Sequence, residues 1–244
     1  MSASRSNSTA AITWREAGIR AVAVDLDGTM VDTAPDFHVA SNAMLSALDL
    51  PQASLQTVVD SVGKGTDHLI RGILGARLQG DSLEAQFAKA RALYLDHYRA
   101  INGRHSRIYP GVVEGLAAMK DMGLRMACVT NKPYEFARGL LDCTGLGRWF
   151  EVVYGGDSLP RRKPDPLPLL QVARDFSVAP AAMLAIGDSS NDAMAARAAG
   201  CKVMVLPYGY NHGLPVQTIE ADGIVGSLME AAELLASAPP HRSR

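Results

Sequence analysis

Two aspartates stand at the end of a short apolar run in the stretch VAVDLDGTMVDT, residues 22–33. Asp25 and Asp27 are two positions apart, so they lie on the same side of an extended strand that Gly28 then breaks. An aspartate is ionised at neutral pH without help from a base, because its reference pKa is about 3.9. Asp25 is therefore the candidate nucleophile. Asp27 is the candidate acid and base that protonates the leaving oxygen and then deprotonates water.

Further polar residues follow later apolar runs. They are Thr130-Asn131-Lys132, Lys163 and the segment Asp188-Ser189-Ser190-Asn191-Asp192. Asp188 and Asp192 would add two acidic groups to the first pair, and such crowding raises some pKa values or demands a cation. Oxygen ligands without His or Cys favour Mg²⁺, which readily shares a site with a substrate phosphate. Lys163, Thr130 and the amides around Asn131 would supply charge and hydrogen bonds for that phosphate.

Short apolar, β-branched runs must bring these side chains together. They occupy residues 19–27, 124–130, 151–156, 182–188 and 202–207. The runs show no clean alternation of polar and apolar residues, which is typical of strands covered on both faces. Beyond about residue 110 strands alternate with helical patterns, which predicts right-handed crossovers and an α/β fold with a doubly wound parallel sheet. Ligands bind beyond the carboxyl ends of such strands, so the polar residues are expected to converge there.

The stretch between the first two strands contains helical patterns only. Two sets of apolar residues repeat at helical spacing: Phe37, Ala40, Met44, Leu45 and Leu48, and then Phe87, Ala90, Tyr94, Tyr98 and Ile101. Thr33 and Asp36 resemble a capping box that opens the first helix. About four helices over residues 35–106 are too long for an ordinary connection, so we expect an inserted all-helical cap domain attached by two hinges.

The predicted organisation is therefore a core interrupted by a cap, with a loose segment at each end of the chain. The predicted ranges are 1–18 for a flexible tail, 19–34 and 107–238 for the core, 35–106 for the cap and 239–244 for a second tail.

Composition excludes several classes of function. The 24 lysines and arginines nearly cancel the 25 aspartates and glutamates, so the net charge of -1 predicts no nucleic-acid or anionic-lipid partner. No apolar stretch reaches the roughly 20 residues needed to cross a bilayer. Three widely spaced cysteines and the lack of a hydrophobic signal region indicate a reducing, cytoplasmic location. The expected partner is a small phosphorylated metabolite, with the protein a monomer or a homodimer.

The chain resembles the haloacid dehalogenase (HAD) superfamily, whose four motifs it matches in order. They are Asp25-x-Asp27-Gly28-Thr29, Thr130-Asn131, Lys163-Pro164-Asp165-Pro166 and Gly187-Asp188-Ser189-x-x-Asp192. Four ordered motifs are far more specific than one match. The resemblance implies a Rossmannoid core with a helical cap inserted after the first motif. It also implies Asp25 as phosphoryl acceptor, Asp27 as acid and base, and Thr130 and Lys163 on the phosphate.

The same resemblance implies that Mg²⁺ is held by the carboxylates of Asp25 and Asp188 and the carbonyl of Asp27. It implies that Asp192 supports these ligands without itself binding the metal. Asp192 is equally well interpreted as the cap of the helix that begins near Asn191, and both roles are compatible. Lys163 follows two arginines, so a solvated basic turn is its alternative interpretation.

Within the superfamily, the stretches KPDPLPLL, GDSSNDAMAARAAG and PYGYNHG are similar to those of bacterial phosphoglycolate phosphatases. The leading hypothesis is a Mg²⁺-dependent phosphatase that converts 2-phosphoglycolate to glycolate and phosphate through an aspartyl-phosphate. Alternatives are a sugar-phosphate phosphatase or a β-phosphoglucomutase-like enzyme, and a phospho-acceptor signalling module.

The cap loop VGKGTD, residues 62–67, does not match a nucleotide-binding loop. Because the cap of similar enzymes lies over the metal site, Lys64 is predicted to meet the anionic end of the substrate, with Arg71 or His68 as alternatives.

Overall fold

The computed structural model describes residue 14 and residues 17–237. Its main sheet has six parallel strands in the order β5-β4-β1-β6-β7-β8. The strands are β1 (Ala21–Val24), β4 (Arg125–Val129), β5 (Val152–Tyr154), β6 (Met183–Gly187), β7 (Lys202–Val205) and β8 (Gly223–Ile224). Each of the five predicted runs contains a strand, and the short edge strand β8 was not predicted. The doubly wound parallel sheet is confirmed.

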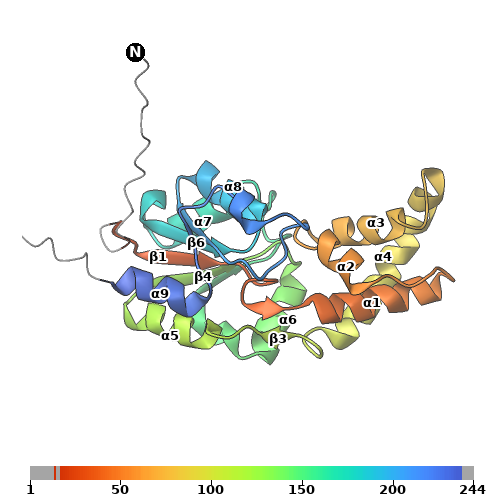
Figure 1. Cartoon of the computed structure of the whole chain (residues 1–244), viewed down its shortest axis with the longest axis horizontal. Helices are drawn as coiled ribbons and strands as arrows, with labels where there is room; N and C mark the ends of the chain where they lie inside the picture. The colour runs from red at the N-terminus through yellow and green to blue at the C-terminus, as the bar shows by residue number, and fades with distance from the viewer. Residues whose placement is uncertain (1–13, 15–16, 238–244) are drawn as a thin grey trace, which may run out of the picture.

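Helices cover both faces of this sheet, as Figure 1 shows. They are α5 (Val112–Asp121), α6 (Tyr134–Cys143), α7 (Leu167–Asp175), α8 (Ser190–Ala199) and α9 (Leu228–Ala236), with the 3-10 turns η1 (Leu146–Trp149), η2 (Pro180–Ala182) and η3 (Val216–Thr218). Val22 and Val24 of β1 pack with α5, α6 and α9, whereas Ala21 and Ala23 pack with α7 and α8. Successive side chains of a strand point to opposite faces of the sheet. Because helices bury both faces, both sets of side chains are apolar.

The predicted cap is a separate group of helices at one end of the molecule (Figure 1). Its helices are α1 (Ala34–Ala47), α2 (Leu55–Ser61), α3 (Thr66–Gly75) and α4 (Asp81–Ile101), and they enclose an apolar core of their own. The chain enters the cap through β2 (Val31–Asp32) and leaves it through β3 (Arg107–Ile108), which pair as an antiparallel ribbon. The two predicted attachments therefore lie side by side.

The predicted capping box at the start of α1 is wrong. The Thr33 side chain makes no capping hydrogen bond, and the buried Asp36 carboxylate turns to the far end of the cap. Asp36 accepts from Gly103 N at 2.7 Å, from His105 N at 2.8 Å and from the Ser106 hydroxyl. The Thr-x-x-Asp spacing matches a local cap, but it cannot distinguish that bond from one to a segment about 70 residues away. Asp36 thus ties the beginning of the cap to its end.

The predicted loose tails fall almost wholly outside the described residues. Trp14, inside the predicted N-terminal tail, is described and is buried in the cluster beneath α5 and α9. Among residues 14 and 17–237, no helix has the length and apolarity of a membrane span.

Candidate active site

The carboxyl end of β1 lies at the point where the order of the strands reverses. From β1 the chain passes to β4 and β5 on one side and then returns to β6 on the other. Asp25 follows β1, Thr130 follows β4 and Asp188 follows β6, so three predicted residues meet at this edge. This switch point is where open parallel sheets bind ligands, because the loops diverge there and leave a crevice.

Gly28 allows the first loop to approach Asp188. Its φ is +81°, and a Cβ at this position would lie 2.3 Å from Asp188 Oδ2, so no larger residue fits. The Thr29 hydroxyl donates to Asp188 Oδ1 at 2.7 Å, and Tyr210 N donates to Oδ2 at 2.5 Å. These bonds fix the direction in which the Asp188 carboxylate points.

Asp25, Asp188 and Asp192 form an acidic cluster in which one carboxylate oxygen of each lies within 4.8 Å of the others. Burial raises the pKa of Asp25 to about 7, and the charges of Asp192 and Asp27 add to this, whereas Lys163 opposes it. Burial also raises the pKa of Asp188, as do Asp192 and Asp25. A bound divalent cation would restore the ionised forms. An all-oxygen donor set with this charge fits Mg²⁺.

Lys163 is fully enclosed at the same edge. Its ammonium donates to Val129 O and to Asp192 Oδ1, both at 2.6 Å, and lies 3.0 Å from Asp25 Oδ1. The first two contacts are hydrogen bonds, and the third is an ion pair with the carboxylate of Asp25. Burial by itself would lower the pKa of Lys163, but Asp192 and Asp25 raise it above the ordinary value, so the side chain stays cationic. The alternative of a solvated basic turn does not apply to Lys163.

Asp192 links the acidic cluster to helix α8. Its Oδ2 accepts from Ser189 N at 3.2 Å and from the Ser189 hydroxyl at 2.7 Å, at the position that caps the helix. Its Oδ1 accepts from Lys163. Asp192 therefore caps the helix and holds the lysine at the same time.

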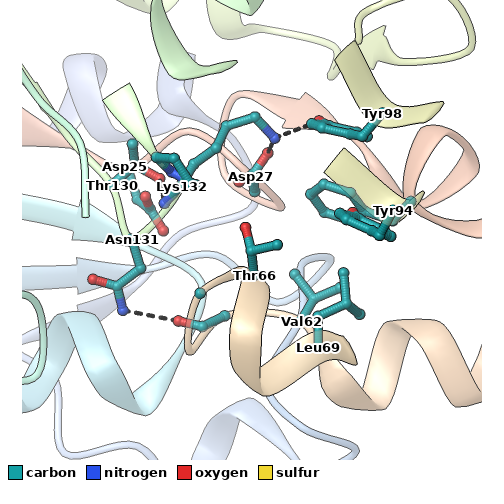
Figure 2. Close-up of a pocket in the computed structure, with 14 residues that line it drawn as sticks. Asp25, Asp27, Val62, Thr66, Leu69, Tyr94, Tyr98, Thr130, Asn131 and Lys132 are labelled. Atoms are coloured by element: carbon teal, nitrogen blue, oxygen red, sulfur yellow. Dashed lines mark hydrogen bonds and ion pairs between the residues drawn. The ribbon is translucent and has the colours of Figure 1, made fainter. Parts of the chain in front are cut away.

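Asp27 is paired with a lysine to which the sequence assigned no role. Lys132 Nζ donates to Asp27 Oδ1 at 2.9 Å and to the Tyr98 hydroxyl at 2.6 Å, as Figure 2 shows. The Lys132 side chain is only 2% exposed, and its ammonium lies over the ring of Phe37. The feature of the sequence that could have indicated a role for Lys132 is its position directly after Thr130-Asn131, at the end of a strand. Its partners cannot be read from the sequence, because both are distant along the chain.

Thr130 and Asn131 both line the crevice between core and cap. The Asn131 amide donates to Gly63 O of the cap loop at 2.9 Å (Figure 2). It also donates to Lys163 O at 2.8 Å. Asn131 therefore joins the cap loop to the segment that carries Lys163.

A family model for haloacid dehalogenase-like hydrolases matches residues 19–200, about three quarters of the chain and all four motifs. The chain belongs to this family. The HAD-like hydrolase is 49% identical to a phosphoglycolate phosphatase of Thiobacillus denitrificans over 90% of this chain and 97% of that protein. It is 45% identical to a phosphoglycolate phosphatase of Nitrosospira multiformis, over 89% and 96% of the two chains.

Solved structures agree with the described fold. A predicted phosphoglycolate phosphatase from Haemophilus somnus superposes with a TM-score of 0.84 at 32% identity, over 89% of this chain and 98% of that one. The predicted family and its core-plus-cap architecture are thus confirmed.

The cap of this HAD-like hydrolase closes one side of the crevice with its loop 62–66 and with α4. Val62, Thr66, Tyr94 and Tyr98 line it opposite Asp27, as Figure 2 shows. Lys64 is exposed and is not among the lining residues, although its neighbours Gly63 and Gly65 are.

The two alternatives to Lys64 also have partners outside the crevice. His68 is bonded to Ser61 O, and Arg71 pairs with Glu84. The contact of Lys64 with a substrate therefore stays a prediction.

Proposed function

We propose that this hydrolase cleaves 2-phosphoglycolate to glycolate and inorganic phosphate in a Mg²⁺-dependent reaction through an aspartyl-phosphate. The observation that carries the proposal is the position of Asp25 at the end of the central strand, 3.0 Å from the Lys163 ammonium and beside Asp188. The phosphoglycolate phosphatases that match nearly the whole chain support the choice of substrate.

In the first step an Asp25 oxygen attacks phosphorus, and the bond from phosphorus to the glycolate oxygen breaks. Mg²⁺, held by the Asp25 and Asp188 carboxylates and the Asp27 carbonyl, would offset the charge of the phosphate. Lys163 adds a fixed positive charge at the site of attack. Thr130 offers a hydroxyl to the phosphate oxygens at the same edge.

Asp27 donates a proton in the first step and regains one in the second. Its Oδ1 is held by Lys132, and the structure shows no partner for Oδ2 among the residues it describes, so Oδ2 is free to meet the leaving oxygen. Asp27 gives that oxygen a proton in the first step. In the second step it takes a proton from the water that attacks the aspartyl-phosphate, which returns Asp25 and releases phosphate.

Phosphate release from 2-phosphoglycolate, glucose 1-phosphate and fructose 1,6-bisphosphate, with Mg²⁺ and with EDTA, tests this proposal. We expect 2-phosphoglycolate to give the highest kcat/KM and EDTA to abolish turnover. Asp25→Asn should lower kcat by at least about 10³-fold, because the amide is not a nucleophile, while thermal unfolding stays cooperative. Unchanged activity in this variant would refute Asp25 as the phosphoryl acceptor.

The same assay separates the competing functions. A β-phosphoglucomutase-like enzyme would return an isomerised sugar phosphate in place of inorganic phosphate. A signalling module would keep its aspartyl-phosphate and show little turnover. The helices over the crevice favour the phosphatase, because a receiver of phosphate needs no cover that excludes water. The cytoplasmic location, the choice between monomer and homodimer, and the limits of the domains stay predictions.

A further inference from the structure

Lys132 is a buried cation with an unused hydrogen-bond donor inside the crevice. Its ammonium has three N–H groups, and the structure gives them two acceptors among the described residues, Asp27 Oδ1 and the Tyr98 hydroxyl. The side chain lines the crevice beside Asp27 (Figure 2). The Phe37 ring, with its centroid 4.4 Å from the ammonium, offers only the weak attraction of its π face. Enclosed polar groups are normally paired with an oxygen or nitrogen acceptor, so the third N–H can still donate to one that enters with a ligand.

Tyr98 contributes a second donor at the same place. Its hydroxyl oxygen accepts from Lys132, and no acceptor for its own proton is found in the part of the chain that the structure describes. Burial raises the pKa of Tyr98 well above its ordinary value, so the hydroxyl keeps that proton. An N–H of Lys132 and the O–H of Tyr98, on atoms 2.6 Å apart, match the two oxygens of one carboxylate.

The position of this donor pair fits the leaving group, not the transferred phosphate. Lys163 and the acidic cluster lie around Asp25, whereas Lys132 is bonded to Asp27, which handles the leaving oxygen. In glycolate the carboxylate is attached to the carbon that carries this oxygen. A cation beside the proton donor is therefore at the right end of the substrate to meet that carboxylate.

Lys64, the cation predicted from the sequence, is exposed and outside the lining of the crevice. A charge pair surrounded by water is weak, while a charged hydrogen bond in an enclosed site is strong. The energetic comparison therefore favours Lys132.

We propose that Lys132, assisted by the Tyr98 hydroxyl, binds the carboxylate of the leaving group and so makes the enzyme selective for phosphate esters of small 2-hydroxy acids. The inference rests on the proposed function, since it assigns the substrate's second charge to a residue of the same site. It also gives the cap a part in selectivity, because Tyr98 belongs to α4 and Lys132 to the core.

The test compares kcat/KM for 2-phosphoglycolate with kcat/KM for 2-hydroxyethyl phosphate, which has the same chain length and no carboxylate. Lys132→Met also frees Asp27, so both values are expected to fall. The ratio of the two should fall about 10- to 100-fold, as for loss of a charged hydrogen bond. Tyr98→Phe should lower the ratio about 3- to 10-fold while it preserves the ring packing. Lys120→Met, an exposed lysine of α5, is the matched control and should leave the ratio unchanged.

Three outcomes would overturn the inference. An equal loss for both esters in Lys132→Met would mean that Lys132 acts through Asp27 alone. A fall of the ratio in Lys64→Ala, with none in Lys132→Met, would return the role to Lys64. If Lys132→Met does not fold, an unchanged ratio in Tyr98→Phe together with an unchanged ratio in Lys132→Gln decides against it.

Inhibition by glycolate separates this inference from the proposed function. With 2-hydroxyethyl phosphate as the substrate, glycolate should inhibit the wild type, and its Ki should rise at least about tenfold in Lys132→Met. A wild type that is inhibited in this way but does not hydrolyse 2-phosphoglycolate would refute the proposed function and keep the carboxylate site. A Ki that does not change in the variant would refute the site.

Discussion

Lys163 and Lys132 are both buried, and each is paired with one aspartate of the first motif, yet their surroundings differ. Lys163 lies 3.0 Å from Asp25, and its other partners, Val129 O and Asp192, also belong to the core. Lys132 lies 2.9 Å from Asp27, and its second partner, Tyr98, comes from the cap. The core alone completes the first environment, whereas the second needs the cap.

The difference separates two tasks in one crevice. The groups that we propose to meet the phosphate are held by short loops after parallel strands, where the sheet fixes their positions. The groups that we propose to meet the rest of the substrate come partly from an inserted domain, where changes of sequence leave the sheet undisturbed. On this proposal chemistry and selectivity are carried by different elements, and variants of the two groups should fail in different ways.

The largest effect is expected for Lys163→Met. It leaves Asp25 and Asp192 buried without their cation, so the free energy of unfolding should fall by about 3 kcal/mol or more. Turnover of 2-phosphoglycolate and of 2-hydroxyethyl phosphate should fall together by at least about 10³-fold. Urea unfolding in EDTA and the phosphate release assay measure both effects. A selective loss of only one ester would break the division between the two lysines.

Mg²⁺ is expected to bind beside Asp25, on the Lys163 side of the crevice, and to stabilise the fold. This stabilisation should depend on pH because Asp25 must be ionised to bind the metal. Burial raises its folded-state pKa to about 7, so in the metal-free protein the ionised form is disfavoured. The contribution of this group to stability is therefore highest below about pH 4 and declines as pH rises toward 7. Mg²⁺ binds the ionised form and competes with the proton, so its stabilisation should increase over the same interval.

The corresponding measurement is thermal unfolding with saturating MgCl₂ and with EDTA. At about 100 times Kd, Mg²⁺ contributes roughly 2.7 kcal/mol, which corresponds to a rise in Tm of about 5–10 °C at pH 8. The rise should be smaller at pH 5, absent in Asp188→Asn and preserved in Lys132→Met. An equal rise at both pH values would contradict the assignment of Asp25 to the metal.

The smallest effect is expected for Tyr210→Phe, which tests the hydrogen bonds that attach the cap to the core. The Tyr210 hydroxyl accepts from Thr33 N and Ala34 N, both at 2.9 Å, and donates to Asp32 Oδ1, while Tyr210 N donates to Asp188. Loss of the hydroxyl should lower the free energy of unfolding by about 1–2 kcal/mol. The ratio of kcat/KM for the two esters should stay within about twofold of the wild type. A larger change would show that the attachment of the cap also sets selectivity.

Much of the core could be predicted from the sequence because its signals are local. The apolar runs contain β1, β4, β5, β6 and β7, and the polar residues that follow them meet at one edge of the sheet. Parallel strands impose this convergence whatever the loops between them do. The cap was predicted for a similar reason, since a stretch with only helical periodicity must bury its apolar faces within itself.

The contacts of individual polar side chains could not be predicted in the same way. Asp36 was assigned to a local capping box and instead reaches Gly103, His105 and Ser106. Thr29 was placed only within the first motif, and the structure shows that its hydroxyl orients Asp188. In each case the partner is distant along the chain and leaves no periodic signal.

By itself the sequence determined the parallel sheet, the helical insert and the set of carboxylates at the strand ends, because these follow from periodicity and from ordered motifs. Only the tertiary structure decided which cation faces which carboxylate. Asp27 and Lys132 are 105 positions apart, and their pairing depends on how the loop after β1, the loop after β4 and helix α4 come together. Burial then sets the strength of such a pair, since a charge removed from water must be met by its neighbours.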